Sequence, residues 1–404
     1  MKLIGNLLYG QSGGPTSVIN ASAYGIIKEA LEHSDDILDI YCCHHGIDGI
    51  LNADLIRISD EQNSDQIELL PHTPGAAFGS VRHKLKKIEE DSSEYKRILE
   101  IFTKYNIRYF FYNGGNDSMD TCNKISLFLK KSGYKCRVIG VPKTIDNDLP
   151  ITDHTPGFGS AAKFISTAIS EIAYDASSYE KGRINIVEVM GRNAGWLAAS
   201  SKLASLSGYG PDLIYLPEVS FNKEKFVEDV KTIYNRQNKC LVVVSEGIKD
   251  ENGSFVAGKG SIDAFGHQQM GGVASYLVSL FSKTGIKTRA IELSLLQRAA
   301  NHLSAKRDIE EAIEVGRRSV TSAINGSNGK MIIIKRLSSH PYMIRYEEAD
   351  LSQVANVEKT IPTDMIVPEG NNVNQKFIDY ALPLIYGENN AIFKDGIIQF
   401  AKFK

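Results

Sequence analysis

Short apolar runs alternate along the chain with longer segments of helical period. Runs that read as buried strands span residues 2–10, 107–115, 136–144, 182–191, 211–218, 238–247 and 331–336. Residues 17–33 and 118–133, which follow the first two of these runs, carry the apolar spacing of helices. Strands that alternate with helices predict βαβ units around parallel sheets, so we expect an α/β fold.

Two segments depart from this alternation. The mixed-charge run VRHKLKKIEEDSSEYKR, residues 81–97, is typical of an exposed helix face, apart from Arg82, which is considered below. The chain from about residue 340 onward has weak periodicity, and the pattern assigns it no role.

Composition narrows the classes of protein. The 404 residues predict two or three domains, and the formal net charge of −2 argues against a nucleic-acid or membrane-surface partner. The five cysteines are scattered without a C-x-x-C pair, which favours free thiols in a reducing compartment. Neither a signal-peptide pattern nor an apolar run of about 20 residues is evident, so we expect a cytoplasmic protein.

Two of the predicted strands end in glycines that open a helix. The segments are GQSGGPTSVIN at residues 10–20 and YNGGNDSMDT at residues 112–121. Backbone N–H groups at such a helix N-terminus can bind phosphate, although neither segment is a Walker A or G-x-G-x-x-G motif. Taken singly, each is equally compatible with a tight turn or, at Asp117, with a helix cap.

The next two strand ends carry charged side chains. In VPKTIDNDLP, residues 141–150, Lys143, Thr144, Asp146 and Asp148 lie within six residues, which favours phosphate and metal chemistry over a polar turn. Asp146 could accept a proton from a substrate hydroxyl as general base. In VEVMGRNAGWLA, residues 187–198, Arg192 could bind an anion or mark a helix start.

Together these loops resemble the phosphofructokinase family. The resemblance rests on GGPTSVIN, GGNDS, PKTIDND, MGRNAGW, the SEG at 245–247 and RAIELSLLQR at 289–298, and it covers roughly residues 4–310. It implies two Rossmann-like α/β/α lobes with mostly parallel sheets and the active site between them. We expect a phosphoryl-donor lobe at 1–155 with part of 290–340, and a sugar-phosphate lobe at 156–290 with the C-terminal segments.

The resemblance also implies roles for individual residues. Those implied in catalysis are Asp146 as the base, Thr144, Arg192, Asp117 and Lys143. Those implied in donor binding are Gly14, Arg82, Gly115, Asp117 and Lys143. Those implied in binding fructose 6-phosphate are Thr144, Asp146, Asp148, Met190, Gly191, Arg192, Glu246 and Arg298. Arg183 and Arg289 match arginines that reach a neighbouring subunit's site, so a homodimer or homotetramer is expected. Asn116 and Asp117 are the expected Mg²⁺ ligands.

The phosphoryl donor follows from two positions. ATP-dependent bacterial members have glycine where Asp117 stands, and many have glycine where Lys143 stands; both changes resemble the pyrophosphate-dependent branch. A carboxylate in place of that glycine would repel the α-phosphate of ATP by about 4 kcal/mol at about 4 Å and an effective dielectric near 20. We therefore expect pyrophosphate to phosphorylate the 1-hydroxyl of fructose 6-phosphate, a reversible glycolytic step.

Alternatives remain open from the sequence. Asn116 replaces a magnesium-binding aspartate, and Leu295 stands where a histidine often contacts the sugar phosphate, so sedoheptulose 7-phosphate is a conceivable substrate. An ATP-dependent phosphofructokinase and a non-catalytic subunit that binds sugar phosphate are the competing interpretations.

Overall fold

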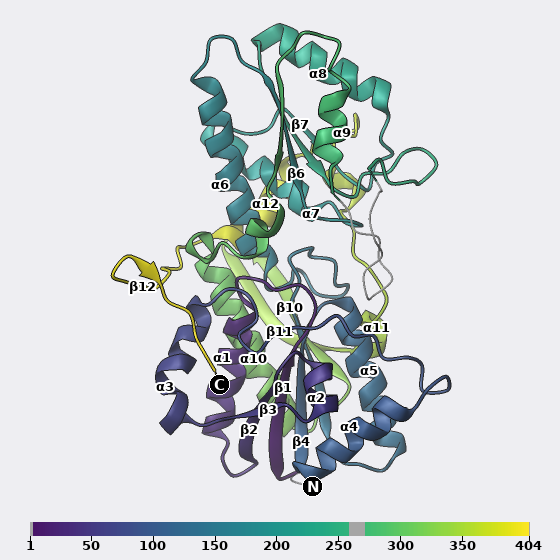
Figure 1. Ribbon diagram of the computed structural model, residues 1–404, viewed down its shortest axis with the longest axis vertical. Helices are drawn as coiled ribbons and strands as arrows, with labels where there is room; N and C mark the ends of the chain where they lie inside the picture. Colours follow the sequence, from purple (N-terminus) through teal and green to yellow (C-terminus); the bar gives the residue numbers. More distant parts are fainter. Residues whose placement is uncertain (1–2, 258–270, 404) are drawn as a thin grey trace. The chain divides into compact units, whose positions relative to one another are not determined.

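The computed structural model describes residues 3–257 and 271–403, and the chain divides into two compact units (Figure 1). The first unit comprises Met1–Gly157, Arg298–Glu358 and Gly387–Lys404. The second comprises Phe158–Gln297 and Lys359–Tyr386. Each is built of helices around a mainly parallel sheet, so the predicted α/β fold class is confirmed.

The first unit contains, in its described part, a seven-stranded sheet in the order β11-β10-β5-β4-β1-β2-β3. Its strands are β1 (Gly5–Gln11), β2 (Ile37–Cys43), β3 (Leu55–Ile58), β4 (Ile107–Gly114), β5 (Arg137–Pro142), β10 (Lys330–Ser339) and β11 (Tyr342–Asp350). The inner pairs are parallel, whereas β3 and β11 pair in the antiparallel direction at the two edges. A short hairpin, β12 (Phe393–Lys394) and β13 (Ile397–Ile398), lies near the C-terminus.

Both faces of this sheet are buried. Leu7 and Tyr9 of β1 belong to one apolar cluster, and Leu8 between them belongs to another. Alternate residues of a strand point to opposite faces, so helices must cover both. This explains why the strands read as continuous apolar runs. The helices of this unit are α1 (Ile19–Glu32), α2 (Ile47–Asn52), α3 (Asp60–Leu69), α4 (Ser93–Lys104), α5 (Asn116–Lys131), α10 (Lys306–Ile324) and α11 (Leu351–Val354), with short 3₁₀ turns at Leu70–His72 and Asn301–Leu303.

Helices α1 and α10 are neighbours in the first unit (Figure 1) and approach each other through glycines. A Cβ atom at Gly25 would lie 2.0 Å from the carbonyl oxygen of Ile313, and one at Gly316 would lie 2.3 Å from that of Ser22. Any side chain at either position would push the helices apart. This contact holds α10, which is about 290 residues after α1 in the sequence, directly against α1.

The strand order contains a switch point beside β1. After β1 the chain builds β2 and β3 on one side and then returns to add β4 on the other. Ligands of open α/β sheets bind where the connections diverge in this way, outside the carboxyl ends of the strands. The glycine-rich segments after β1 and β4 both lie at this point.

The second unit has a four-stranded parallel sheet in the order β7-β8-β6-β9 among its described residues. The strands are β6 (Ile184–Val189), β7 (Leu213–Tyr215), β8 (Cys240–Ser245) and β9 (Thr288–Glu292). The helices are α6 (Phe158–Ser177), α7 (Trp196–Ser200), α8 (Lys223–Gln237), α9 (Val273–Ser279) and α12 (Gln375–Ala381), with 3₁₀ turns at Ser201–Ser207, Ser294–Arg298, Thr363–Met365 and Leu382–Ile385. Strand β9 forms one edge of this sheet.

The interpretation of residues 81–97 as one helix face is wrong. Helix α4 begins only at Ser93, and most of the preceding segment is irregular. Leu85 inserts into an apolar cluster and is buried, which a fully solvated helix face would not allow. Among the described residues, no helix is both long and apolar enough to cross a membrane.

Candidate active site

The carboxyl ends of β1, β4 and β5 bring three predicted loops of the first unit together. The three strands are adjacent and parallel, with Gln11 of β1 opposite Asn113 of β4, and Gly114 of β4 opposite Pro142 of β5. The loops that follow therefore emerge at one edge of the sheet. They carry Gly14, the start of α5 and the Lys143–Asp148 segment.

Lys143 is a buried lysine that ties two of these loops together. Its side chain is 2% exposed, and Nζ donates hydrogen bonds to the carbonyl oxygens of Ser12 at 3.0 Å and Gly14 at 2.6 Å. The pKa of Lys143 is lowered to about 7, mainly by burial and to a lesser extent by the positive charge of Arg298. The negative charges of Asp146 and Asp148 oppose this shift. The site thus holds a cation whose charge is costly until an anion arrives.

Thr144, Asp146 and Asp148 form the next part of the same loop. The backbone N–H of Asp146 donates to Thr144 Oγ1 at 3.1 Å, which fixes the turn that presents the aspartate. Burial and the neighbouring charge of Asp146 raise the pKa of Asp148. Within the described residues, Asp148 Oδ1 is buried without a hydrogen-bond partner. The pair therefore combines one constrained carboxylate with one that favours its protonated form.

Helix α5 begins at the end of the second loop, with Gly115 as its N-cap and Asn116 and Asp117 in its first turn. Asn116 Nδ2 donates to the carbonyl of Val357, and Asn116 Oδ1 accepts from the backbone N–H of Asn356 at 2.5 Å. Asp117 is partly exposed and lies 3.9 Å from Lys84 Nζ. Asn116 thus anchors a later segment of the chain, while Asp117 keeps its carboxylate at the positive end of the helix.

Two arginines add positive charge near Lys143. Arg298 lies beside Gly14, since a Cβ atom at that glycine would be 2.9 Å from Arg298 Nη1. Arg82, in the irregular segment before α4, also lowers the pKa of Lys143 through its charge. The first unit therefore brings Gly14, Arg82, Lys143, Asp146, Asp148 and Arg298 into one electrostatic cluster.

The loop after β6 holds three of the predicted sugar-phosphate residues in the second unit. The N–H of Met190 donates to Gln297 Oε1 at 3.1 Å, and Gly191 has φ of 118°, in the region that favours glycine. Ser245 Oγ donates to the carbonyl of Gly191. Arg192 follows in the same loop and is partly buried.

Glu246 lies at the end of the neighbouring strand. Its backbone N–H donates to the carbonyl of Val189 at 2.9 Å, which places it beside the loop of Met190 and Arg192. A Cβ atom at Gly247 would lie 1.8 Å from the carbonyl oxygen of Arg192. The S-E-G segment and the M-G-R segment therefore pack directly against each other.

Arg183 and Arg289 lie at the other end of this sheet. Arg183 immediately precedes β6, and Arg289 is the second residue of the adjacent β9, opposite Asn185. Met190 follows the carboxyl end of β6, a strand of six residues that spans roughly 20 Å at about 3.3 Å per residue. The structure does not bring these two arginines together with Met190 and Arg192.

Several residues that hold the site were not predicted. Gln297 supports Met190, Ser245 supports Gly191, and the buried Asn147 accepts from the N–H of Thr155 at 3.1 Å. Gln297 and Ser245 adjoin the predicted Arg298 and Glu246, and Asn147 lies between two predicted aspartates. These residues could have been identified from the sequence as polar residues that adjoin candidate ligands at the ends of strands.

The described residues contain no group of three or more His, Cys, Asp or Glu side chains arranged to hold a metal ion. Mg²⁺ commonly uses only one or two protein carboxylates and takes its remaining ligands from water and phosphate. The partly exposed Asp117 carboxylate, in the first turn of α5, fits that pattern. Asn116 is the weaker candidate because its amide already binds the backbone of residues 356 and 357.

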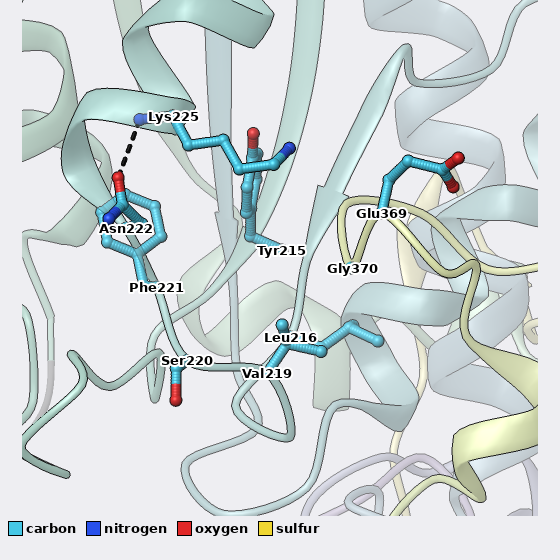
Figure 2. A pocket seen from close by; sticks show the side chains of 9 residues that line it. All are labelled: Tyr215, Leu216, Val219, Ser220, Phe221, Asn222, Lys225, Glu369 and Gly370. Atoms are coloured by element: carbon cyan, nitrogen blue, oxygen red, sulfur yellow. Dashed lines mark hydrogen bonds between the residues drawn. The ribbon is translucent and has the colours of Figure 1, made fainter.

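The second unit contains a pocket (Figure 2). It is lined by Tyr215, Leu216, Val219, Ser220, Phe221, Asn222, Lys225, Glu369 and Gly370. Asn222 caps helix α8 by accepting from the N–H of Lys225 at 2.8 Å, the bond drawn in Figure 2. Asn222 therefore serves the start of a helix, and no predicted site residue lines this pocket.

Comparison with known proteins agrees with this geometry. A profile of the phosphofructokinase family matches residues 6–320. A Halomonas elongata protein named pyrophosphate–fructose 6-phosphate 1-phosphotransferase is 45% identical over 98% of this chain and 96% of its own length. A Methylococcus capsulatus protein of the same name is 43% identical over 97% and 94%.

A solved structure gives the same result. The crystal structure of a pyrophosphate-dependent phosphofructokinase from Marinobacter aquaeolei superimposes with a TM-score of 0.89, at 42% identity, over 99% of this chain and 96% of that one. The chain belongs to the phosphofructokinase family.

Proposed function

We propose that this chain transfers a phosphoryl group from pyrophosphate to the 1-hydroxyl of fructose 6-phosphate, giving fructose 1,6-bisphosphate and phosphate. The observation that carries the proposal is that Asp117, in the first turn of α5, and the buried Lys143, directly after β5, stand on loops that follow two adjacent parallel strands. These are the two positions that resemble the pyrophosphate-dependent branch. The full-length relatives that carry this activity in their names support the same donor and acceptor.

The electrostatics of the first unit favour a compact, highly charged donor. Lys143, Arg298 and Arg82 place three cationic side chains around the glycine loop after β1. Pyrophosphate would restore the charge of Lys143 by compensating its burial. The carboxylate of Asp117 disfavours a nucleotide α-phosphate, at a cost of about 4 kcal/mol for two charges roughly 4 Å apart.

Asp146 is proposed as the general base. The hydroxyl of Thr144 accepts a hydrogen bond from the N–H of Asp146, which fixes the backbone from which the carboxylate projects. The raised pKa of Asp148 favours its protonated form, and Asp146 is the group proposed to accept the proton of the sugar 1-hydroxyl. Lys143 and Arg192 are proposed to stabilise the charge of the transferring and leaving phosphoryl groups.

Mg²⁺ is proposed to bind at Asp117 together with pyrophosphate oxygens. When bound, the metal would neutralise charge on the donor. The contribution of the chain itself is the carboxylate of Asp117 at the helix N-terminus, together with the cluster of Lys143, Arg82 and Arg298 in the same unit.

Fructose 6-phosphate is proposed to contact Met190, Gly191, Arg192 and Glu246, with Arg298 as a ligand of its 6-phosphate. Arg183 and Arg289 are separated from that loop by the length of β6. Their proposed role is therefore in the site of a neighbouring subunit, which makes the active form a homodimer or homotetramer.

A cytoplasmic location is also proposed. All five cysteines are free thiols and buried, which suits a reducing compartment.

The function is tested by measuring fructose 1,6-bisphosphate formation from pyrophosphate and fructose 6-phosphate with magnesium in the wild type and in Asp146→Ser. If the chain is a catalyst, turnover in the variant should fall by a factor of about 10²–10⁴. The dissociation constant of fructose 6-phosphate, measured by calorimetry, should stay within a few-fold of the wild-type value. Asp35→Ser, in an exposed turn before β2, is the matched control and should keep wild-type turnover. Wild-type enzyme without turnover, yet able to bind fructose 6-phosphate, would instead indicate a regulatory subunit.

A further inference from the structure

A buried histidine in the first unit lies between two carboxylates. His154 is 1% exposed; its Nδ1 is 2.7 Å from Asp153 Oδ2 and its Nε2 is 2.6 Å from Glu311 Oε2. Ionised carboxylates only accept hydrogen bonds, so both ring nitrogens must donate, and the ring is an imidazolium. Burial by itself lowers the pKa of His154, but Glu311 and Asp153 together raise it to about 9.

The charged and titratable groups around His154 come from its own loop and from three packed elements. Asp153 belongs to the loop of His154, and Glu311 belongs to α10. Arg336 of β10 lies 2.9 Å from Asp153 Oδ2. The hydroxyl of Tyr342, in β11, donates to Glu311 Oε1 at 2.6 Å. Arg307 stacks over the Tyr342 ring at 4.3 Å. The network thus joins a helix and two strands that lie about 150 to 190 residues later in the chain.

The loop that carries His154 is also bonded directly to the segment with the proposed base. Thr155 Oγ1 donates to the carbonyl of Thr144 at 2.9 Å, and the N–H of Thr144 donates to the carbonyl of Pro156 at 3.2 Å. The N–H of Thr155 donates to Asn147 Oδ1 at 3.1 Å. These bonds hold Thr144 and Asn147, which lie before and after Asp146 in the chain.

Helix α10 holds the same loop at a second point. The N–H of Gly157 donates to Asp308 Oδ1 at 2.9 Å, one turn before Glu311 on the helix. Residues 153–157 are therefore fastened to α10 at both ends. The His154–Glu311 attachment is an ion pair between two side chains, whereas Asp308 accepts from a backbone N–H.

We propose that His154 is a positioning residue for the phosphoryl transfer: clamped between Asp153 and Glu311, it fixes the backbone of residues 144–148 and so the carboxylate of Asp146. The inference rests on the proposed function, since it assigns the clamp to that reaction. His154 does not contact the substrates; it acts through Thr155, Pro156 and Asn147.

The protonation of His154 gives the clamp a definite pH dependence. Its folded-state pKa lies above the value near 6.5 of an unfolded histidine, so its stabilising effect is complete below about 6.5 and is lost as pH rises through about 9. Loss of the clamp should loosen Asp146. A misplacement of about 1 Å in a reacting group costs roughly 10²-fold in rate.

The test compares the wild type with His154→Gln, whose amide can donate to only one of the two carboxylates. At saturating pyrophosphate and fructose 6-phosphate, we expect kcat to fall about 10- to 100-fold, with both KM values within threefold. The wild-type kcat should also decline above about pH 9, and the variant should lack that decline. His33→Gln is the control, because His33 has a single carboxylate partner, Glu29, at the end of α1. A variant with intact fold and kcat within twofold of the wild type overturns the inference.

Two further measurements keep the test decisive. If His154→Gln does not fold, Tyr342→Phe removes only the hydroxyl bond to Glu311 and should shift the alkaline decline to higher pH; an unshifted decline overturns the inference. ¹⁵N-histidine NMR of the wild-type protein should show the His154 ring, assigned through the variants, as an imidazolium that persists to about pH 9, and a neutral His154 at pH 7.5 overturns the inference. Wild-type enzyme without turnover would contradict the proposed function, and the NMR readout would still test the charged clamp.

Discussion

The side-chain amine of Lys143 donates to the carbonyl oxygen of Gly14 at 2.6 Å. The two residues follow β5 and β1, which are separated in the sheet by β4 alone. The bond draws the two loops together across the end of β4, so a single buried cation lies against the glycine segment that is proposed to bind phosphate.

The charge of Lys143 should control pyrophosphate capture. Because the pKa of Lys143 in the free enzyme is about 7, kcat/KM for pyrophosphate should fall as pH rises through that value, since kcat/KM reports the free enzyme. Lys143→Met should lower kcat/KM at pH 6 by roughly 10²-fold, the equivalent of about 2.7 kcal/mol for a charge-assisted contact. The ratio of wild type to variant should shrink as pH rises. The ionisation of pyrophosphate itself cancels in that ratio, and a ratio that is constant from pH 6 to 8.5 would contradict the role of Lys143.

Gln297 should affect sugar-phosphate binding more than donor binding. Its buried amide oxygen holds the N–H of Met190, and its Nε2 donates to the carbonyl of Ser294 at 3.1 Å. Gln297→Leu leaves the partly buried N–H of Met190 without this partner, at about 1–3 kcal/mol, so KM for fructose 6-phosphate should rise about tenfold. Gln399→Leu, which removes one exposed bond to the carbonyl of Ile397, is the control. An equal rise in the KM for pyrophosphate would argue against the assignment.

Arg289 and Asp146 should complement each other between subunits. If Arg289 acts in a neighbour's site, Arg289→Ala and Asp146→Ser homo-oligomers are both nearly inactive, but a hybrid dimer contains one complete site. Random mixing of the two variants through reversible unfolding should restore about a quarter of wild-type activity, because half of the dimers are hybrids with one working site in two. Mixtures no more active than the sum of their parents would place Arg289 outside the neighbouring site.

Much of the fold could be predicted because strands buried on both faces read as unbroken apolar runs. The runs at 107–115 and 136–144 correspond to β4 and β5, and Gly114 and Gly115 mark the loop after β4. Residues 81–97 were mispredicted because a run of charges hides the buried Leu85, whose apolar environment is supplied by other segments.

The site was predictable only in its local parts. Lys143, Asp146 and Asp148 share one loop, so their proximity follows from sequence. Gln297 and Met190 are 107 residues apart, and His154 and Glu311 are 157 residues apart. Such bonds depend on strand order and helix packing, neither of which is recorded in the local pattern of residues.

The central claim is that pyrophosphate is the donor. The most direct measurement is the rate of fructose 1,6-bisphosphate formation by the wild-type enzyme with magnesium, comparing pyrophosphate and ATP at matched concentrations. The account predicts rapid turnover with pyrophosphate and little with ATP, because Asp117 and Lys143 favour a donor without an α-phosphate. Faster turnover with ATP than with pyrophosphate would contradict it.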